Sequence, residues 1–250
     1  MAWGFACVSY AWLTLPDVRP LRTTPPTTTA FMDLRASEAR AAGKPVRKSQ
    51  RWINYGRISS SLSRAVLVAE DAAFWSHDGI DLDEIKASIE DSIETGEAPR
   101  GASTITQQLA KNLYLSPSRN PTRKLTELFI TRRLEASLSK KRILELYLNL
   151  IEWGDDIWGC DAAARTYFGV SASDLSPSQA AMMAGAIINP RRYSPARPNA
   201  RLLRRQAIIL RRMGEVTPPS AATPDTDGKG DVPKWLDDAS RADKSGAPVR

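Results

Sequence analysis

The chain has 250 residues, of which 42% are hydrophobic and 25% charged, and its net charge at pH 7 is +7. This composition is sufficient for one core of moderate size, and the length excludes two full-sized enzymes. Two distant cysteines, Cys7 and Cys160, and a single histidine give no support to a disulfide framework or a zinc site. The positive charge favours an acidic partner, without distinguishing nucleic acid, an anionic membrane and a phosphorylated substrate.

The N-terminal 48 residues differ in composition from the rest of the chain. Residues 1–15 form an apolar run that is shorter than the roughly 20 residues of a membrane span and lacks a basic flank. We expect them to be the outer part of a truncated transmembrane anchor; a segment on the surface or in the core is the alternative. Adjacent prolines and polar residues predict an extended linker over residues 16–48.

Helical patterns dominate the sequence between residues 49 and 214, for which we predict one mainly α-helical domain. The sequence contains no long alternating strand pattern, no Walker-type loop and no internal repeat. The predicted helices start near Thr104, Pro121, Ser176 and Asn199, and the last one ends before Gly214. Residues 215–250 are rich in Pro, Asp, Ser and Gly, and we predict a disordered tail.

The stretch that begins at Ser103 combines hydroxyls, two glutamines and a lysine on one predicted helix. At about 100° per residue, Gln108 and Lys111 lie on the side opposite to Leu109. Thr104 and the Gln three residues later have the spacing of a capping box, so we expect the Ser103 and Thr104 hydroxyls to point outward beside free N–H groups. Such a helix end attracts anions. The spacing alone more often indicates an ordinary capped helix with a solvated face.

Two glutamates are candidates for chemistry. Glu70 follows an apolar block, where burial would raise its pKa and suit it to general base catalysis. The alternative is an ordinary acid at a helix end. Glu127 follows Arg123 by one helical turn, and the simplest interpretation is an exposed ion pair that contributes about 0.3 to 0.5 kcal/mol. We expect His77 to form a structural hydrogen bond.

A cluster of cations precedes Glu127 and gives it a second interpretation. The cations are Lys111, Arg119, Arg123 and Lys124. A glycosidase needs a carboxylic acid that protonates its leaving group. A diphosphate leaves without an acid and requires positive charge and N–H donors. The cations therefore favour a diphosphate leaving group.

Five segments between residues 70 and 169 resemble, in order, the motifs of family 51 peptidoglycan glycosyltransferases. The segments are EDAAFWSHDGID (70–81), RGASTITQQLAKNLYL (100–115), RKLTELFITRRLE (123–135), KKRILELYLNLIEWG (140–154) and AARTYFG (163–169). We expect the chain to be most similar to the monofunctional members, because the 81 residues after the fifth motif leave too little room for a transpeptidase domain. The resemblance implies a lysozyme-like helical head and a smaller jaw subdomain that touches the membrane.

The resemblance also implies a reaction, in which lipid II is polymerised. Glu70 would remove the proton from the GlcNAc 4-hydroxyl of lipid II, which attacks MurNAc C1 of the growing chain with inversion and releases undecaprenyl diphosphate. Glu127 would orient or help to bind the donor. The substrate-binding positions implied by the match are Ser103, Gln108, Lys111, Arg119, Arg123 and Lys124. No metal ligand and no required cofactor are implied, although members of the family can bind Mg²⁺ or Mn²⁺ near the diphosphate.

The implied location is the bacterial inner membrane, with a single span and the catalytic domain on the periplasmic side. The implied partners are lipid II, the growing lipid-linked glycan, the membrane surface and proteins of cell-wall synthesis or division, but no nucleic acid. The resemblance further implies competition by the phosphoglycolipid moenomycin. Two alternatives remain: a lysozyme-like lytic enzyme that cleaves polymer, and a noncatalytic membrane-binding module that uses the eight arginines between Arg191 and Arg212.

Overall fold

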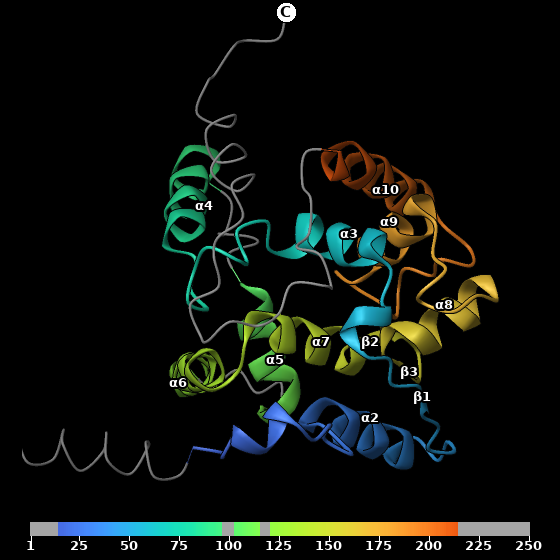
Figure 1. The fold of residues 1–250 in the computed structure, drawn as a ribbon, viewed down its shortest axis with the longest axis horizontal. Helices are drawn as coiled ribbons and strands as arrows, with labels where there is room; N and C mark the ends of the chain where they lie inside the picture. The colour runs from blue at the N-terminus through green and yellow to red at the C-terminus, as the bar shows by residue number, and fades with distance from the viewer. Residues whose placement is uncertain (1–14, 97–102, 116–120, 215–250) are drawn as a thin grey trace, which may run out of the picture. The chain divides into compact units, whose positions relative to one another are not determined.

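The computed structural model describes residues 15–96, 103–115 and 121–214 (Figure 1). These residues form mostly helices and one small three-stranded sheet, which confirms the prediction of a mainly α-helical protein. They divide into two compact units that alternate along the chain. Unit 1 contains the described parts of 1–48 and 78–151, and unit 2 contains 49–77 and the described part of 152–250. The predicted head and jaw subdomains stay a prediction.

Unit 1 is built around helix α5. Its elements are η1 (Arg19–Arg22), α2 (Ala30–Ala41), α4 (Leu82–Thr95), α5 (Ile105–Tyr114), α6 (Pro121–Ser137) and α7 (Lys140–Leu150). Helix α5 packs against α2, α6 and α7. Its apolar residues Ile105 and Leu109 are fully buried, as the predicted amphipathic pattern requires.

The prediction of an extended linker over residues 16–48 is wrong for much of this segment. Thr29, which we assigned to the linker, is the N-cap of α2, because its side chain accepts a hydrogen bond from the Met32 N–H. Met32 is buried, and α2 packs on α5. The turn at η1 is also fixed, since the Arg142 Nε donates to the Leu21 carbonyl at 2.7 Å. A tertiary contact thus overrides the loop-like composition.

The predicted anchor and tail lie almost entirely outside the described residues. Only Leu15 of the predicted anchor is described, and it is buried. Across residues 15–96, 103–115 and 121–214, no helix has the length and hydropathy needed to cross a membrane.

Unit 2 combines three helices that pack on one another with the small sheet. Helix α3 (Ser60–Glu70) packs against α9 (Pro177–Ala186) and α10 (Ala200–Met213). The remaining elements are β1 (Ser49–Gln50), η2 (Tyr55–Arg57), β2 (Glu152–Gly154), β3 (Ile157–Trp158) and α8 (Cys160–Phe168). The strand order is β1-β3-β2, with β1 parallel and β2 antiparallel to β3.

The sheet was not predicted, because its strands have only two or three residues each. A period of two cannot be recognised over so short a length. Helix α7 ends at Leu150, and a short break between Ser137 and Lys140, where Ser139 caps α7, separates it from α6.

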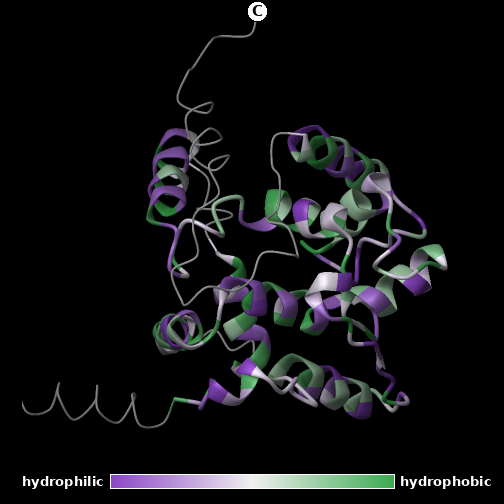
Figure 2. Cartoon of the chain, viewed as in Figure 1, coloured by the Kyte–Doolittle hydropathy of each residue, from purple (hydrophilic) through white to green (hydrophobic). Residues whose placement is uncertain are grey.

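The predicted starts of α9 and α10 are confirmed. Ser176 and Gln179 form a capping box at α9, and Asn199 caps α10. Apolar and polar residues alternate around α10 (Figure 2). Its buried face contains Leu202, whereas the neighbouring Leu203 is 46% exposed. A Cβ at Gly185 of α9 would lie 3.2 Å from the Leu202 side chain, so this glycine permits close packing of the two helices.

Candidate active site

The predicted site residues belong to both units. Glu70 is part of unit 2, and the candidates from Ser103 to Glu127 belong to unit 1. Arg119 lies outside the described residues. The two groups are therefore described one after the other.

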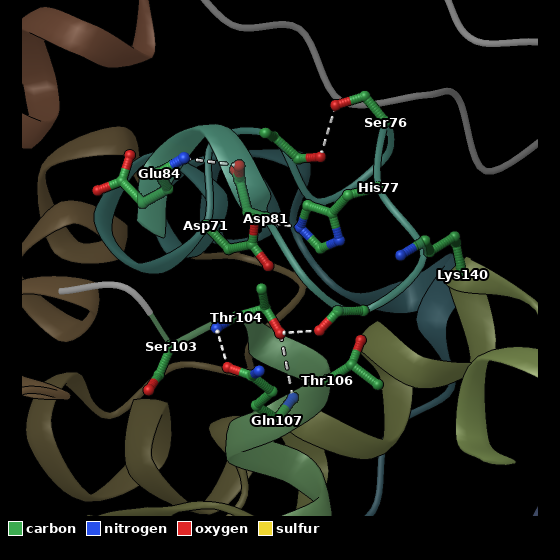
Figure 3. A network of polar contacts seen from close by, with 12 residues as sticks. Asp71, Ser76, His77, Asp81, Glu84, Ser103, Thr104, Thr106, Gln107 and Lys140 are labelled. Carbon is green, nitrogen blue, oxygen red and sulfur yellow. Dashed lines mark hydrogen bonds and ion pairs between the residues drawn. The ribbon is translucent and has the colours of Figure 1, made fainter. Parts of the chain in front are cut away.

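Glu70 is the last residue of α3 and is half-buried. The helix is anchored by a fully buried apolar face that includes Leu62 and Leu67. The next residue, Asp71, is buried and lies 3.0 Å from the Nε2 atom of His77 (Figure 3). This contact confirms the structural hydrogen bond predicted for His77. An acid does stand where the chain leaves the interior, and Asp71 is tied to His77.

The start of α5 in unit 1 confirms the capping box (Figure 3). The Thr104 hydroxyl accepts from the Gln107 N–H at 3.2 Å, and the Gln107 side chain accepts from the Thr104 N–H at 3.2 Å. The Thr104 hydroxyl also donates to the Gly79 carbonyl at 2.8 Å. The prediction that this hydroxyl points outward is wrong, because the contact with Gly79 buries it. Ser103 is exposed, as predicted.

Gly79 lets the loop before α4 lie close to helix α6. Its φ angle is +82°, which favours glycine, and a Cβ would lie 2.7 Å from the Thr131 methyl group and 2.8 Å from Cγ of Glu135. Glu135 in turn accepts hydrogen bonds from Thr106 at 2.5 Å and from Lys140 at 2.8 Å. Contacts from α6, α7 and the loop therefore hold the first turn of α5.

Gln108 and Lys111 are both half-buried on the next turn of α5. The Gln108 Nε2 donates to the Ser103 carbonyl at 3.3 Å, and its Oε1 accepts from the Tyr147 hydroxyl at 2.8 Å. Tyr147 lies on α7 and is fully buried. Sequence reasoning missed Tyr147 because it belongs to the apolar pattern of its helix, although it is part of the fourth motif.

Glu127 is buried, so the simplest sequence interpretation, an exposed ion pair, is wrong. Only 4% of the residue is exposed. Its Oε1 lies 2.5 Å from the Lys124 Nζ and its Oε2 lies 3.5 Å from an Arg123 nitrogen. The structure thus brings three of the predicted residues together. A buried carboxylate needs such partners, because an uncompensated charge in the interior is costly.

The fifth motif serves the fold of unit 2. Arg165 donates to Asp161 at 2.9 Å, and Asp161 also accepts from the Ser171 hydroxyl and the Ala172 N–H, each at 2.8 Å. Burial by itself would raise the pKa of Asp161, but these hydrogen bonds lower the pKa below its ordinary value. The arrangement ties α8 to the segment that follows it.

Comparison with known proteins identifies the family to which these motifs belong. The family model described as Transglycosylase matches residues 38–214. The chain belongs to the transglycosylase family. This result confirms the family and the enzyme class predicted from the motifs, and it overturns the alternative of a noncatalytic module.

Several relatives are similar to this transglycosylase over most of its length. It is 47% identical over 194 residues to the biosynthetic peptidoglycan transglycosylase of Laribacter hongkongensis, and the aligned region covers 78% of this chain and 85% of the relative. The corresponding protein of Aromatoleum aromaticum is 51% identical over 168 residues, with coverages of 67% and 73%. That of Nitrosomonas eutropha is 46% identical over 192 residues, with coverages of 77% and 79%.

Proposed function

We propose that this peptidoglycan glycosyltransferase transfers the growing lipid-linked chain to the GlcNAc 4-hydroxyl of lipid II. The observation that carries the proposal is the pairing of both Glu127 oxygens with cations. A lytic enzyme needs a carboxylic acid beside its second carboxylate to protonate the leaving group. The cations held at Glu127 are suited to a diphosphate leaving group, which needs positive charge and no proton donor.

In the proposed reaction, Glu70 takes the proton of the 4-hydroxyl as the new bond to MurNAc C1 forms with inversion. The bond from C1 to the diphosphate oxygen breaks, and undecaprenyl diphosphate leaves as an anion that needs no proton. Lys111 and Arg119 supply positive charge, and the exposed Ser103 and the half-buried Gln108 supply hydrogen bonds. Arg123 and Lys124 act through Glu127, which they hold in place.

A divalent cation does not fit the carboxylate that this proposal places beside the donor. Both oxygens of Glu127 are ion-paired, so a metal would have to displace Lys124 or Arg123. We therefore assign no step to Mg²⁺ or Mn²⁺.

The enzyme is proposed to work at the periplasmic surface of the inner membrane, anchored by one span and alongside cell-wall synthesis or division proteins. Helix α4 supports contact with a membrane surface. Its residues Leu82, Ile89 and Ile93 are 73%, 48% and 78% exposed. They are seven and four residues apart, so they lie on one face of the helix. Exposed apolar side chains on one helical face fit a lipid surface.

Incubation with labelled lipid II and, separately, with finished glycan tests the proposal. We expect long polymer from lipid II and no fragments from the glycan. Release of fragments from finished glycan, together with no polymer from lipid II, would favour the lytic alternative.

A further inference from the structure

The contact between Tyr147 and Gln108 joins the core of unit 1 to the donor groove that we propose around Ser103, Gln108 and Lys111. Tyr147 has no exposed surface, and its hydroxyl donates to Gln108 Oε1 at 2.8 Å. Helices α5 and α7, which carry the two residues, pack directly on each other. The Tyr147 hydroxyl is thus a polar group that is held in the interior of unit 1 and donates to Oε1 of Gln108.

Two contacts of the Gln108 side chain fix the orientation of its amide. The Ser103 carbonyl can only accept, so the Gln108 nitrogen must face it, and the distance is 3.3 Å. The oxygen then faces the Tyr147 hydroxyl, which donates. Rotating the amide by half a turn would place two oxygens against each other at Ser103. Tyr147 and Ser103 therefore select the same orientation.

We propose that Tyr147 is a positioning residue that makes Gln108 present N–H groups, not its carbonyl oxygen, on the Ser103 side of α5. This inference rests on the proposed function, in which that side binds the sugar and diphosphate of the donor. An anionic or hydroxylic substrate oxygen requires a donor there, and a carbonyl oxygen in the same place would repel it. The buried Tyr147 thereby determines that Gln108 acts as a hydrogen-bond donor, and not as an acceptor, toward the substrate.

Replacing Tyr147 with Phe tests this role, because it removes the hydroxyl and keeps the buried ring. We expect the KM for lipid II to rise about fivefold, the effect of one neutral hydrogen bond, while kcat changes less than twofold. The matched control is Tyr167→Phe in unit 2, which removes a phenol that donates to the Trp153 carbonyl at 2.9 Å. It should leave the KM unchanged.

A double-mutant cycle separates positioning from packing. In a Gln108→Ala background, Tyr147→Phe should raise the KM no further. An equal increase in both backgrounds would mean that Tyr147 acts through packing, and the proposal would be wrong. If Gln108→Ala itself leaves the KM unchanged, the proposed function has placed Gln108 incorrectly. If Gln108→Ala raises the KM and Tyr147→Phe does not, only the present inference fails.

A second variant keeps the test decisive if Tyr147→Phe folds poorly. Gln108→Glu retains an oxygen for Tyr147 but has no N–H to offer, so its KM should rise at least as much as that of Gln108→Ala. A wild-type KM in Gln108→Glu would overturn the proposal.

The side-chain amide signal of Gln108 in a ¹⁵N-correlated NMR spectrum provides a test that does not depend on turnover. The signal should shift in Tyr147→Phe and stay in place in Tyr167→Phe. An unchanged signal in Tyr147→Phe would also contradict the proposal.

Discussion

Helices α5 and α10 are both amphipathic, but they place their polar side chains in opposite environments. Helix α5 carries one cation, Lys111, and buries Thr106, Gln107 and Asn112. Helix α10 carries five arginines and no acid, and only Arg205 among them is half-buried, where it donates to the Gly185 carbonyl at 3.1 Å. The remaining arginines of α10 are Arg201, Arg204, Arg211 and Arg212, all of them exposed.

The difference shows that charge and order are separate signals of function. A buried polar group is costly unless it is hydrogen-bonded, so the contacts around α5 hold their side chains in fixed positions. Exposed arginines contribute to the net charge without being held in one geometry. The net charge of the whole chain suggested an acidic partner. The polar side chains that are held in fixed positions, however, lie on α5, which carries only one lysine.

The largest effect should follow from Glu70→Gln, which changes one charge at a position that α3 holds in place. The amide has nearly the same shape and cannot accept the proton, so polymerisation of lipid II should fall about 10²- to 10⁴-fold while the fold is retained. The control is Glu94→Gln on the exposed part of α4, which removes the same charge. A folded Glu70→Gln enzyme with more than half of wild-type activity would show that Glu70 is not the base.

The next effect compares the two helices directly. Lys111→Met should reduce kcat/KM for lipid II about 10- to 100-fold, because a charged hydrogen bond to the leaving group is lost. Arg204→Met removes one exposed charge and should stay within about twofold. Similar losses in both variants would indicate that overall charge, and not position, controls turnover.

Binding of moenomycin gives a smaller effect that does not depend on turnover. If its phosphate occupies the groove, Lys111→Met should weaken the Kd about tenfold in calorimetric titrations. Glu70→Gln and Arg204→Met should keep most of the affinity, since neither removes a groove cation. Wild-type affinity in Lys111→Met would exclude Lys111 from the donor site.

The smallest expected effect concerns the two capping boxes, at the starts of α5 and α9. Thr104→Ala should lower the free energy of unfolding by about 2 to 3 kcal/mol, because the cap is lost and the Gly79 carbonyl is left without its donor. Ser176→Ala at the exposed start of α9 should cost only about 0.5 to 1 kcal/mol. Denaturant unfolding of both variants measures the difference. Equal costs would mean that the buried contact with Gly79 adds nothing.

These capping boxes also show which features the sequence could reveal. The starts of α5 and α9 were predictable because the cap and its partner are three residues apart. The burial of Thr104 was not, since it depends on Gly79, which lies 25 positions earlier. The same holds for Glu127, whose local ion pair is visible in the sequence while its burial depends on packing.

Motif order revealed the family and the enzyme class, and it indicated most of the candidate site residues. It could not reveal Tyr147, whose hydroxyl acts across two helices and whose ring fits the apolar pattern of α7. Helix α2 was missed for a related reason: its threonine-rich start resembles a linker until the contact with α5 is known.

The alternation of the two units along the chain has a consequence for the order of folding. Helix α3, which ends at Glu70, packs mainly against α9 and α10, the last described helices to be synthesised. Contacts between such distant segments form late and slowly, because a long loop must close first. During synthesis, the helix that carries Glu70 therefore lacks these packing partners until the end of the domain has been made. Shortening the chain before α9 should for this reason disable a residue more than a hundred positions upstream.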